Sequence, residues 1–187
     1  IIEPMLGYDY LARPVKLVPL TLREMPEVSN NGSSYTFKLK QGIVFADDPV
    51  FKGKTRELVA QDYAYSIRRL FDPSLRSPWL FLLDGKIIGM DEVVAKAKAN
   101  NKFDYDAPIA GLEVVDRHTL RINLKEPDYN LLYILAMPTL GALAREVVEQ
   151  YGDDISGHPV GTGPYVLKSW ARGHKMILEA NPKFRES

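Results

Sequence analysis

The stretch LVAQDYAYSIRRLFDPSLRSPW, residues 58–79, predicts the clearest helix of the chain and the turn that ends it. Its apolar side chains recur at the spacing of one helix face. They are Val59, Tyr63, Ile67, Leu70 and Phe71. The polar side chains between them are Gln61, Asp62, Arg68 and Arg69. We expect the apolar set to face the core and the polar set to occupy the other side.

The charged residues of this helix suit the helix dipole, and a proline marks its end. Asp62 lies near the expected N-terminus, whereas Arg68 and Arg69 lie near the C-terminus, which is the favourable arrangement. Pro73 cannot continue a helix, so the helix should end near Asp72. The chain then turns outwards.

Trp79 is the first candidate for a binding residue. Pro78 stiffens the backbone directly before this large amphipathic ring, and such a ring is costly to leave in water. One interpretation is that Trp79 is presented to a ligand or partner. The other is that it packs in the core, against a second helix or a hairpin, as buried tryptophans usually do.

Composition indicates an ordinary globular chain. The 187 residues are 45% hydrophobic and 26% charged, with 24 basic and 24 acidic side chains, so no global field attracts nucleic acid or an anionic bilayer. Cysteine is absent, which excludes disulfides, thiolate metal sites and cysteine nucleophiles. No apolar run approaches the ~20 residues that a membrane helix needs.

Alternating patterns predict antiparallel strands. Residues 34–40 alternate strictly, and two further pairs of segments read as hairpins, 112–124 and 165–179. Helices are expected at 90–99, 129–137 and 142–151, and a helix end within 2–10. The predicted fold class is therefore α+β, with antiparallel hairpins covered by packed helices.

Three local expectations concern which residues are buried and which are exposed. Val114 should face the core together with Leu112 on the first strand of the 112–124 hairpin. His118, at the tip of that hairpin, should be a solvated turn residue, because no nucleophile or acidic partner is evident beside it. The charged stretch 46–58 should be a solvated loop.

The sequence offers no catalytic, metal or cofactor residues. No serine lies in a G-x-S-x-G elbow, and His118, His158 and His174 lack metal-ligand spacing. The stretch GKIIGMDEVVAKAK, residues 85–98, has glycines before a helix but lacks the Lys-Ser/Thr of a phosphate loop. An enzyme is therefore disfavoured.

Five ordered motifs carry a family resemblance. They are AQDYAYSIRRLFDP with the following SPW, YTFKLKQGIVF, VVDRHTLRINLKEP, PVGTGPYVLKSW and NPKF. Together they resemble the bacterial extracellular solute-binding proteins of family 5, the oligopeptide-, dipeptide- and nickel-binding components of ABC importers. The chain departs from the family at Val59, where a capping Thr is usual, at the insertion 46–58, and at Trp79, where Tyr is common.

The resemblance implies a periplasmic or extracellular receptor with two lobes, of the type II periplasmic-binding-protein kind, that closes on a solute and presents it to a membrane permease. Residues 1–187 would be one fragment, mainly the small subdomain of the first lobe with its core in 30–184, and the second lobe would be absent. Trp79 would line the ligand cavity. The favoured solute is a peptide; the alternatives are a nickel chelate, a sugar or haem, or a structural module that binds a partner. Contact with the membrane would occur only through the permease.

Overall fold

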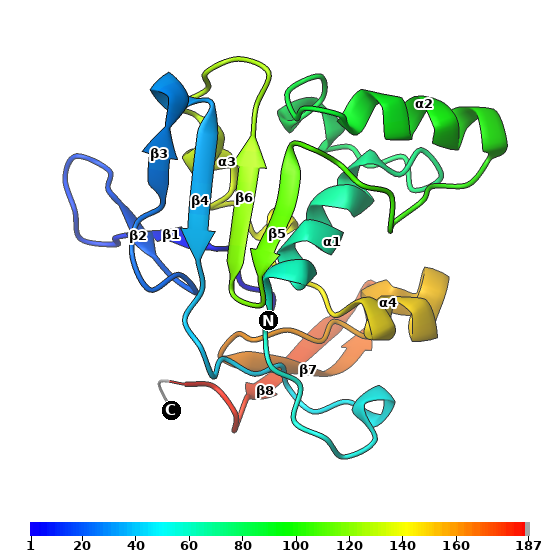
Figure 1. The fold of residues 1–187 in the computed structure, drawn as a ribbon. Coiled ribbons are helices and arrows are strands. Elements are labelled where there is room, and N and C mark those ends of the chain that lie inside the picture. Colours follow the sequence, from blue (N-terminus) through cyan, green and yellow to red (C-terminus); the bar gives the residue numbers. More distant parts are fainter. Residues whose placement is uncertain (186–187) are drawn as a thin grey trace.

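The computed structural model describes residues 1–185, which form three antiparallel sheets with helices packed against them (Figure 1). The central sheet has the strand order β3-β4-β6-β5. Its strands are β3 (Glu27–Ser29), β4 (Ser34–Lys38), β6 (Thr119–Asn123) and β5 (Leu112–Asp116). The expected α+β class is confirmed.

The pairing of β4 with β6 joins two segments that are far apart in the sequence. Tyr35 lies opposite Ile122 and Phe37 opposite Leu120, and all four side chains are buried. The alternation predicted for residues 34–40 is therefore confirmed. Val114 does not follow its prediction: it pairs with the buried Leu120 but is 37% exposed, on the strand at the edge of the sheet.

Helix α1 (Ala60–Phe71) lies against β5 and β6, as its apolar stripe predicts. Its polar side differs from expectation: Asp62 and Arg68 are buried, Arg69 is half-buried and only Gln61 is exposed. Loops and α4 also cover that side, and they supply polar partners. Arg68 Nη1, for example, donates to the Ala107 carbonyl at 2.7 Å.

The remaining helices are shorter than or close to their predicted lengths. They are α2 (Met90–Asn100), α3 (Leu131–Ile134) and α4 (Arg145–Tyr151). Helix α2 is confirmed, with Val93 and Ala97 buried. The helix predicted at 129–137 is only a single turn, and Pro138 follows it. Helix α4 begins three residues later than predicted, because Ala144 has an extended backbone.

Five 3-10 turns connect these elements. They are η1 (Asn30–Gly32), η2 (Pro49–Phe51), η3 (Leu80–Leu82), η4 (Pro138–Leu140) and η5 (Gly152–Gly157). Turn η1 consists of Asn30, Asn31 and Gly32, which all have positive φ. Glycine and asparagine tolerate that left-handed conformation best.

The N-terminal segment forms a strand where a helix end was expected. Strand β1 (Leu6–Tyr8) pairs antiparallel with β2 (Leu17–Pro19), so the helix end expected within 2–10 was wrong. Met5 and Leu6 are buried. Because β2 supplies hydrogen-bond partners for the backbone of β1, this segment does not need to form a helix.

The last hairpin is confirmed. Strands β7 (Tyr165–Ala171) and β8 (Lys175–Ala180) pair antiparallel, and all of β8 is exposed. The hairpin lies below the central sheet (Figure 1). At its base the buried Asn181 donates from its backbone N–H to Pro164 O and from Nδ2 to Gly163 O, both at 2.8 Å.

The glycines of the GTGP motif are required by a close passage of backbone. A Cβ on Gly161 would lie 2.3 Å from the Ile1 carbonyl oxygen, and one on Gly163 would lie 2.7 Å from the same atom. The Gly163 N–H donates to that oxygen at 2.8 Å, while Thr162 between them donates to the Glu3 carboxylate at 2.7 Å. The motif thus packs closely against residues 1–3.

Gly161→Ala should therefore destabilise the protein by about 1–3 kcal/mol, the usual range for overpacking, because the contact is with backbone that cannot rotate away. Urea denaturation measures this loss. Gly157→Ala is the matched control, since nothing lies within 4 Å of a Cβ built there. Equal stability of the two variants would contradict the close passage.

Candidate ligand-binding surface

The connection from α1 to α2 begins at a well-bonded turn. The Asp72 carboxylate accepts from the N–H and the hydroxyl of Ser74, at 2.9 and 2.7 Å, and from the Tyr105 hydroxyl at 2.6 Å. Burial opposes ionisation of Asp72, but these hydrogen bonds outweigh it and hold its pKa below its ordinary value. The start of the connection is therefore fixed, and the predicted helix end at Asp72 and Pro73 is confirmed.

Trp79 lies on the surface of the described chain, with 42% of it exposed. It immediately precedes η3, where its carbonyl accepts from the Leu82 N–H at 3.1 Å. Its ring lies beside that of Phe81, which is 68% exposed, with 6.5 Å between the ring centroids. Trp79 is thus no core residue of this chain, while its predicted contact with a ligand stays a prediction.

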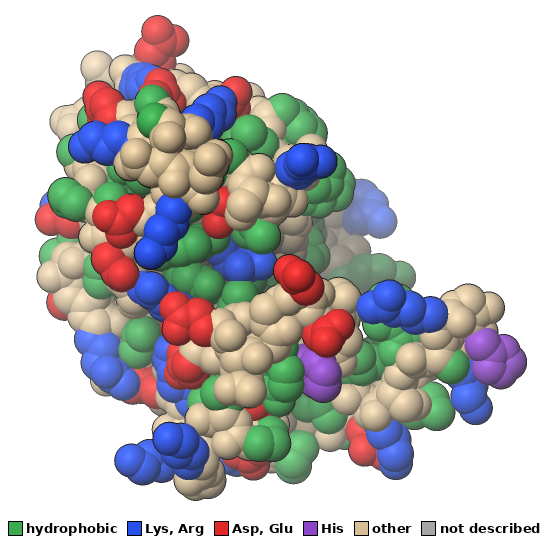
Figure 2. All heavy atoms as spheres, turned by 90° about the vertical axis from the view of Figure 1, so that its right-hand side faces the viewer, with side chains coloured by type: hydrophobic (Ala, Val, Ile, Leu, Met, Phe, Trp, Pro, Cys, Tyr) green, Lys and Arg blue, Asp and Glu red, His purple; other side chains and the backbone are tan. Residues whose placement is uncertain are grey.

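A separate cleft of about 1040 Å³ lies between the ends of α1 and α2 and the start of α4. Trp79 does not line it. Arg145, on its wall, pairs with Asp106 and Glu149 at 2.6 Å each, so its positive charge is compensated within the chain. Figure 2 looks onto this side of the molecule and shows acidic and basic side chains interspersed.

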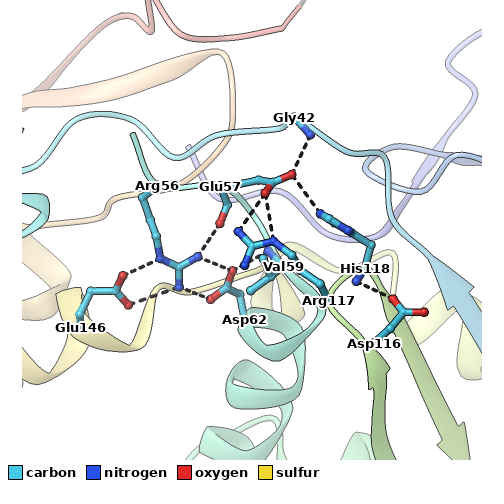
Figure 3. Close-up of polar contacts among 9 residues, drawn as sticks. All are labelled: Gly42, Arg56, Glu57, Val59, Asp62, Asp116, Arg117, His118 and Glu146. Carbon is cyan, nitrogen blue, oxygen red and sulfur yellow. Dashed lines mark hydrogen bonds and ion pairs between the residues drawn. The ribbon is translucent and has the colours of Figure 1, made fainter. Parts of the chain in front are cut away.

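The structure brings together a polar cluster that the sequence did not predict (Figure 3). Arg56 bonds to Asp62 at the start of α1, at 2.6 Å, and to Glu146 of α4, at 2.5 Å. Burial disfavours the charged guanidinium, but the bonds to both carboxylates outweigh burial and raise its pKa. Asp62 also accepts from the Val59 N–H at 2.8 Å, which is the half of a capping box that the third helical residue supplies.

The stretch 46–58 is consequently anchored, which corrects the expectation of a wholly solvated loop. Phe45 donates to Arg56 O and Leu58 to Ile43 O, both at 2.8 Å, so the base of the loop is paired. Phe51 is buried near its middle, while the tip, residues 52–55, is exposed together with Asp47 and Pro49.

His118 is not a solvated residue without an acidic neighbour. Its side chain is 18% exposed, and its Nε2 lies 3.0 Å from Oε1 of Glu57 (Figure 3). Arg117 donates to the other oxygen of Glu57, at 2.9 Å from Nη2, and the Gly42 N–H also donates to Glu57, at 3.0 Å. No hydroxyl or thiol nucleophile is bonded to the His118 ring among residues 1–185, so the group ties the hairpin tip to the loop.

These contacts make the carboxylate of Glu57 unusually acidic. The Gly42 N–H and Arg117 are the main causes, with His118 adding to them, and they lower the pKa of Glu57 from 4.5 to about 2. Its folded-state pKa lies below its unfolded value, so Glu57 stabilises the fold fully above pH 4.5. That contribution is lost as the pH falls towards 2.

Glu57→Gln should lower the free energy of unfolding at pH 7, and the difference from wild type should shrink between pH 4.5 and about 2, because wild type loses this contribution there. Urea denaturation at a series of pH values measures it. Glu92→Gln, at an exposed position on α2, is the control. A difference that stays constant down to pH 2 would contradict the assignment.

Residues 1–185 contain neither a metal-binding cluster nor a membrane-spanning helix. No cluster of three or more His, Asp or Glu side chains there could hold a metal ion. None of the helices in that range is long and apolar enough to cross a membrane.

Comparison with solved structures defines the fold. Listeria monocytogenes OppA bound to peptide matches with a TM-score of 0.80 at 24% identity, over 99% of this chain and 34% of that one. Haemophilus influenzae OppA in complex with RPPGFSPFR matches with a TM-score of 0.77 at 23% identity, over 100% and 33%. The fold is that of one part of a two-lobed periplasmic binding protein.

Sequence comparison identifies the family. The model of the bacterial extracellular solute-binding proteins, family 5 Middle, matches residues 16–187. The chain belongs to this family, whose members are periplasmic or extracellular substrate-binding proteins and not enzymes.

Curated relatives are much longer than this chain. Periplasmic oligopeptide-binding protein OppA of Salmonella typhimurium is 29% identical over 153 residues, which are 80% of this chain and 26% of that protein. Di/tripeptide-binding protein 2 of Pseudomonas aeruginosa is 32% identical over 168 residues, 87% of this chain and 29% of its own length. The chain therefore spans less than a third of these relatives.

Proposed function

We propose that this chain is part of the substrate-binding component of an ABC importer, which captures a peptide between two lobes and delivers it to a membrane permease. The observation that carries the proposal is what its relatives bind: they are oligopeptide-, di/tripeptide- and glutathione-binding proteins. Each of these ligands contains peptide bonds. The fold by itself does not select a peptide, since a structure in complex with agropinic acid shares it at a TM-score of 0.70.

We also propose that residues 1–187 supply mainly the small subdomain of the first lobe, with its core in 30–184. Two observations support this division. The chain spans only 34% of the matched Listeria structure. The β7–β8 hairpin, moreover, exposes Tyr165, Trp170, Met176 and Leu178, a set of apolar side chains that the rest of a larger protein would cover.

The isolated 187-residue polypeptide should therefore fold but bind peptides weakly. Affinity in a receptor that closes by hinge motion comes from burying the ligand against both lobes. Calorimetry of this polypeptide against a peptide mixture should detect no heat of binding, whereas the full-length receptor should show it. Submicromolar binding by the isolated polypeptide would mean that it is a complete binding domain.

Trp79 is the residue of this chain that we propose to contact the ligand. Trp79→Ala in the full-length receptor should weaken peptide binding by about 1–3 kcal/mol, as for loss of one well-buried aromatic contact. The melting temperature without ligand should stay nearly unchanged, because 42% of the residue is exposed. Calorimetry and thermal denaturation of the same variant measure both quantities.

The alternative role of Trp79 gives the opposite result. A tryptophan that supports the fold would cost roughly 3–5 kcal/mol of stability when truncated to alanine. A large fall in melting temperature, with intact affinity in the fraction that stays folded, would contradict the binding role.

A further inference from the structure

The turn η3 separates its side chains into two sets. Leu80 and Leu82 are half-buried and pack on the hydrophobic core, and Leu83 is 1% exposed. Trp79 and Phe81, which alternate with them, are exposed. The turn is thus held by its leucines and displays two aromatic rings.

The backbone that carries the two rings is held in place. Backbone hydrogen bonds of 3.1 Å run from the Leu82 N–H to Trp79 O and from the Leu83 N–H to Leu80 O, and Pro78 restricts the backbone before the turn. The ring planes are inclined at 36° to each other. A ring pair on such a turn needs little ordering when a ligand binds, which favours affinity.

Phe81 is the less expected member of the pair. An exposed tryptophan keeps a polar N–H that can bond to water or ligand, whereas phenylalanine has no polar group to balance its exposed ring. A phenylalanine that is 68% exposed buries little apolar area within this chain. Its ring would therefore bury more area against a ligand or another part of the protein.

We propose that Phe81 acts with Trp79 as a two-ring contact for an aromatic side chain of the bound peptide, the ring of Phe, Tyr or Trp. This inference rests on the proposed peptide-binding function. Aromatic rings interact best at centroid distances of 4.5–7 Å in offset or edge-to-face arrangements. Two rings inclined to each other offer a guest ring one face and one edge. Phe81 accordingly determines specificity by shape and apolar contact.

The test uses the full-length receptor and two pools of short peptides that differ at one position, which is Phe in one pool and Ala in the other. Phe81→Ala should weaken binding of the Phe pool about tenfold and that of the Ala pool less than about twofold, the scale of one aromatic pair. Calorimetry measures both affinities, and thermal denaturation checks that the variant is folded.

Two further variants separate the ring from its bulk and its position. Phe81→Leu keeps apolar volume but loses the ring, and should recover only part of the affinity for the Phe pool. Leu75→Ala removes another exposed apolar side chain of the same connection, 42% exposed, and should leave both affinities unchanged.

The outcomes are distinguishable. Equal loss for both pools, or no loss for either, would overturn the role of Phe81 while leaving peptide binding in place. Failure of the wild-type receptor to bind either pool would instead refute the proposed function, and this inference with it.

Discussion

The buried carboxylate of Glu3 is the interaction on which the assembly of the chain depends. It accepts from Thr162 at 2.7 Å and from both terminal nitrogens of Arg185, at 2.8 and 3.0 Å. A buried carboxylate without partners is strongly unfavourable, so residues near both ends and the loop at Thr162 must be in place together. The glycines beside Thr162 are what let the backbone approach closely enough for these bonds to form.

The polar cluster around Arg56 and Glu57 likewise joins distant segments, at the start of α1. Arg56 joins a loop, α1 and α4, and Glu57 joins that loop to the hairpin tip at His118. Because these groups are half-buried, removing one partner leaves another without compensation. The charged residues of the 46–58 stretch thereby fix the loop, the start of α1 and α4 relative to one another. The connection to Trp79 follows from the end of α1.

Local patterns were sufficient to predict much of the fold. The alternation through Tyr35 and Phe37 and the turn at Pro73 depend on residues close in sequence, and all were confirmed. The failures involve distant partners: Glu57 is 61 residues from His118, and Glu146 is 90 residues from Arg56. A single sequence gives no sign of such pairs. Proline before Trp79 favoured display of that ring, but its ligand contact is untested by the structure. Phe81 was missed, although the leucines on either side of it were a usable signal.

The exposed β7–β8 hairpin has a consequence for how stability is distributed along the chain. A two-stranded hairpin is marginal by itself, and this one is fastened mainly where Asn181 bonds to the backbone at Gly163 and Pro164. The central sheet, by contrast, buries Tyr35, Phe37 and their partners. We therefore expect the hairpin to open as a separate cooperative unit at a lower free energy than the sheet, and its amide hydrogens to exchange with solvent while the core stays closed.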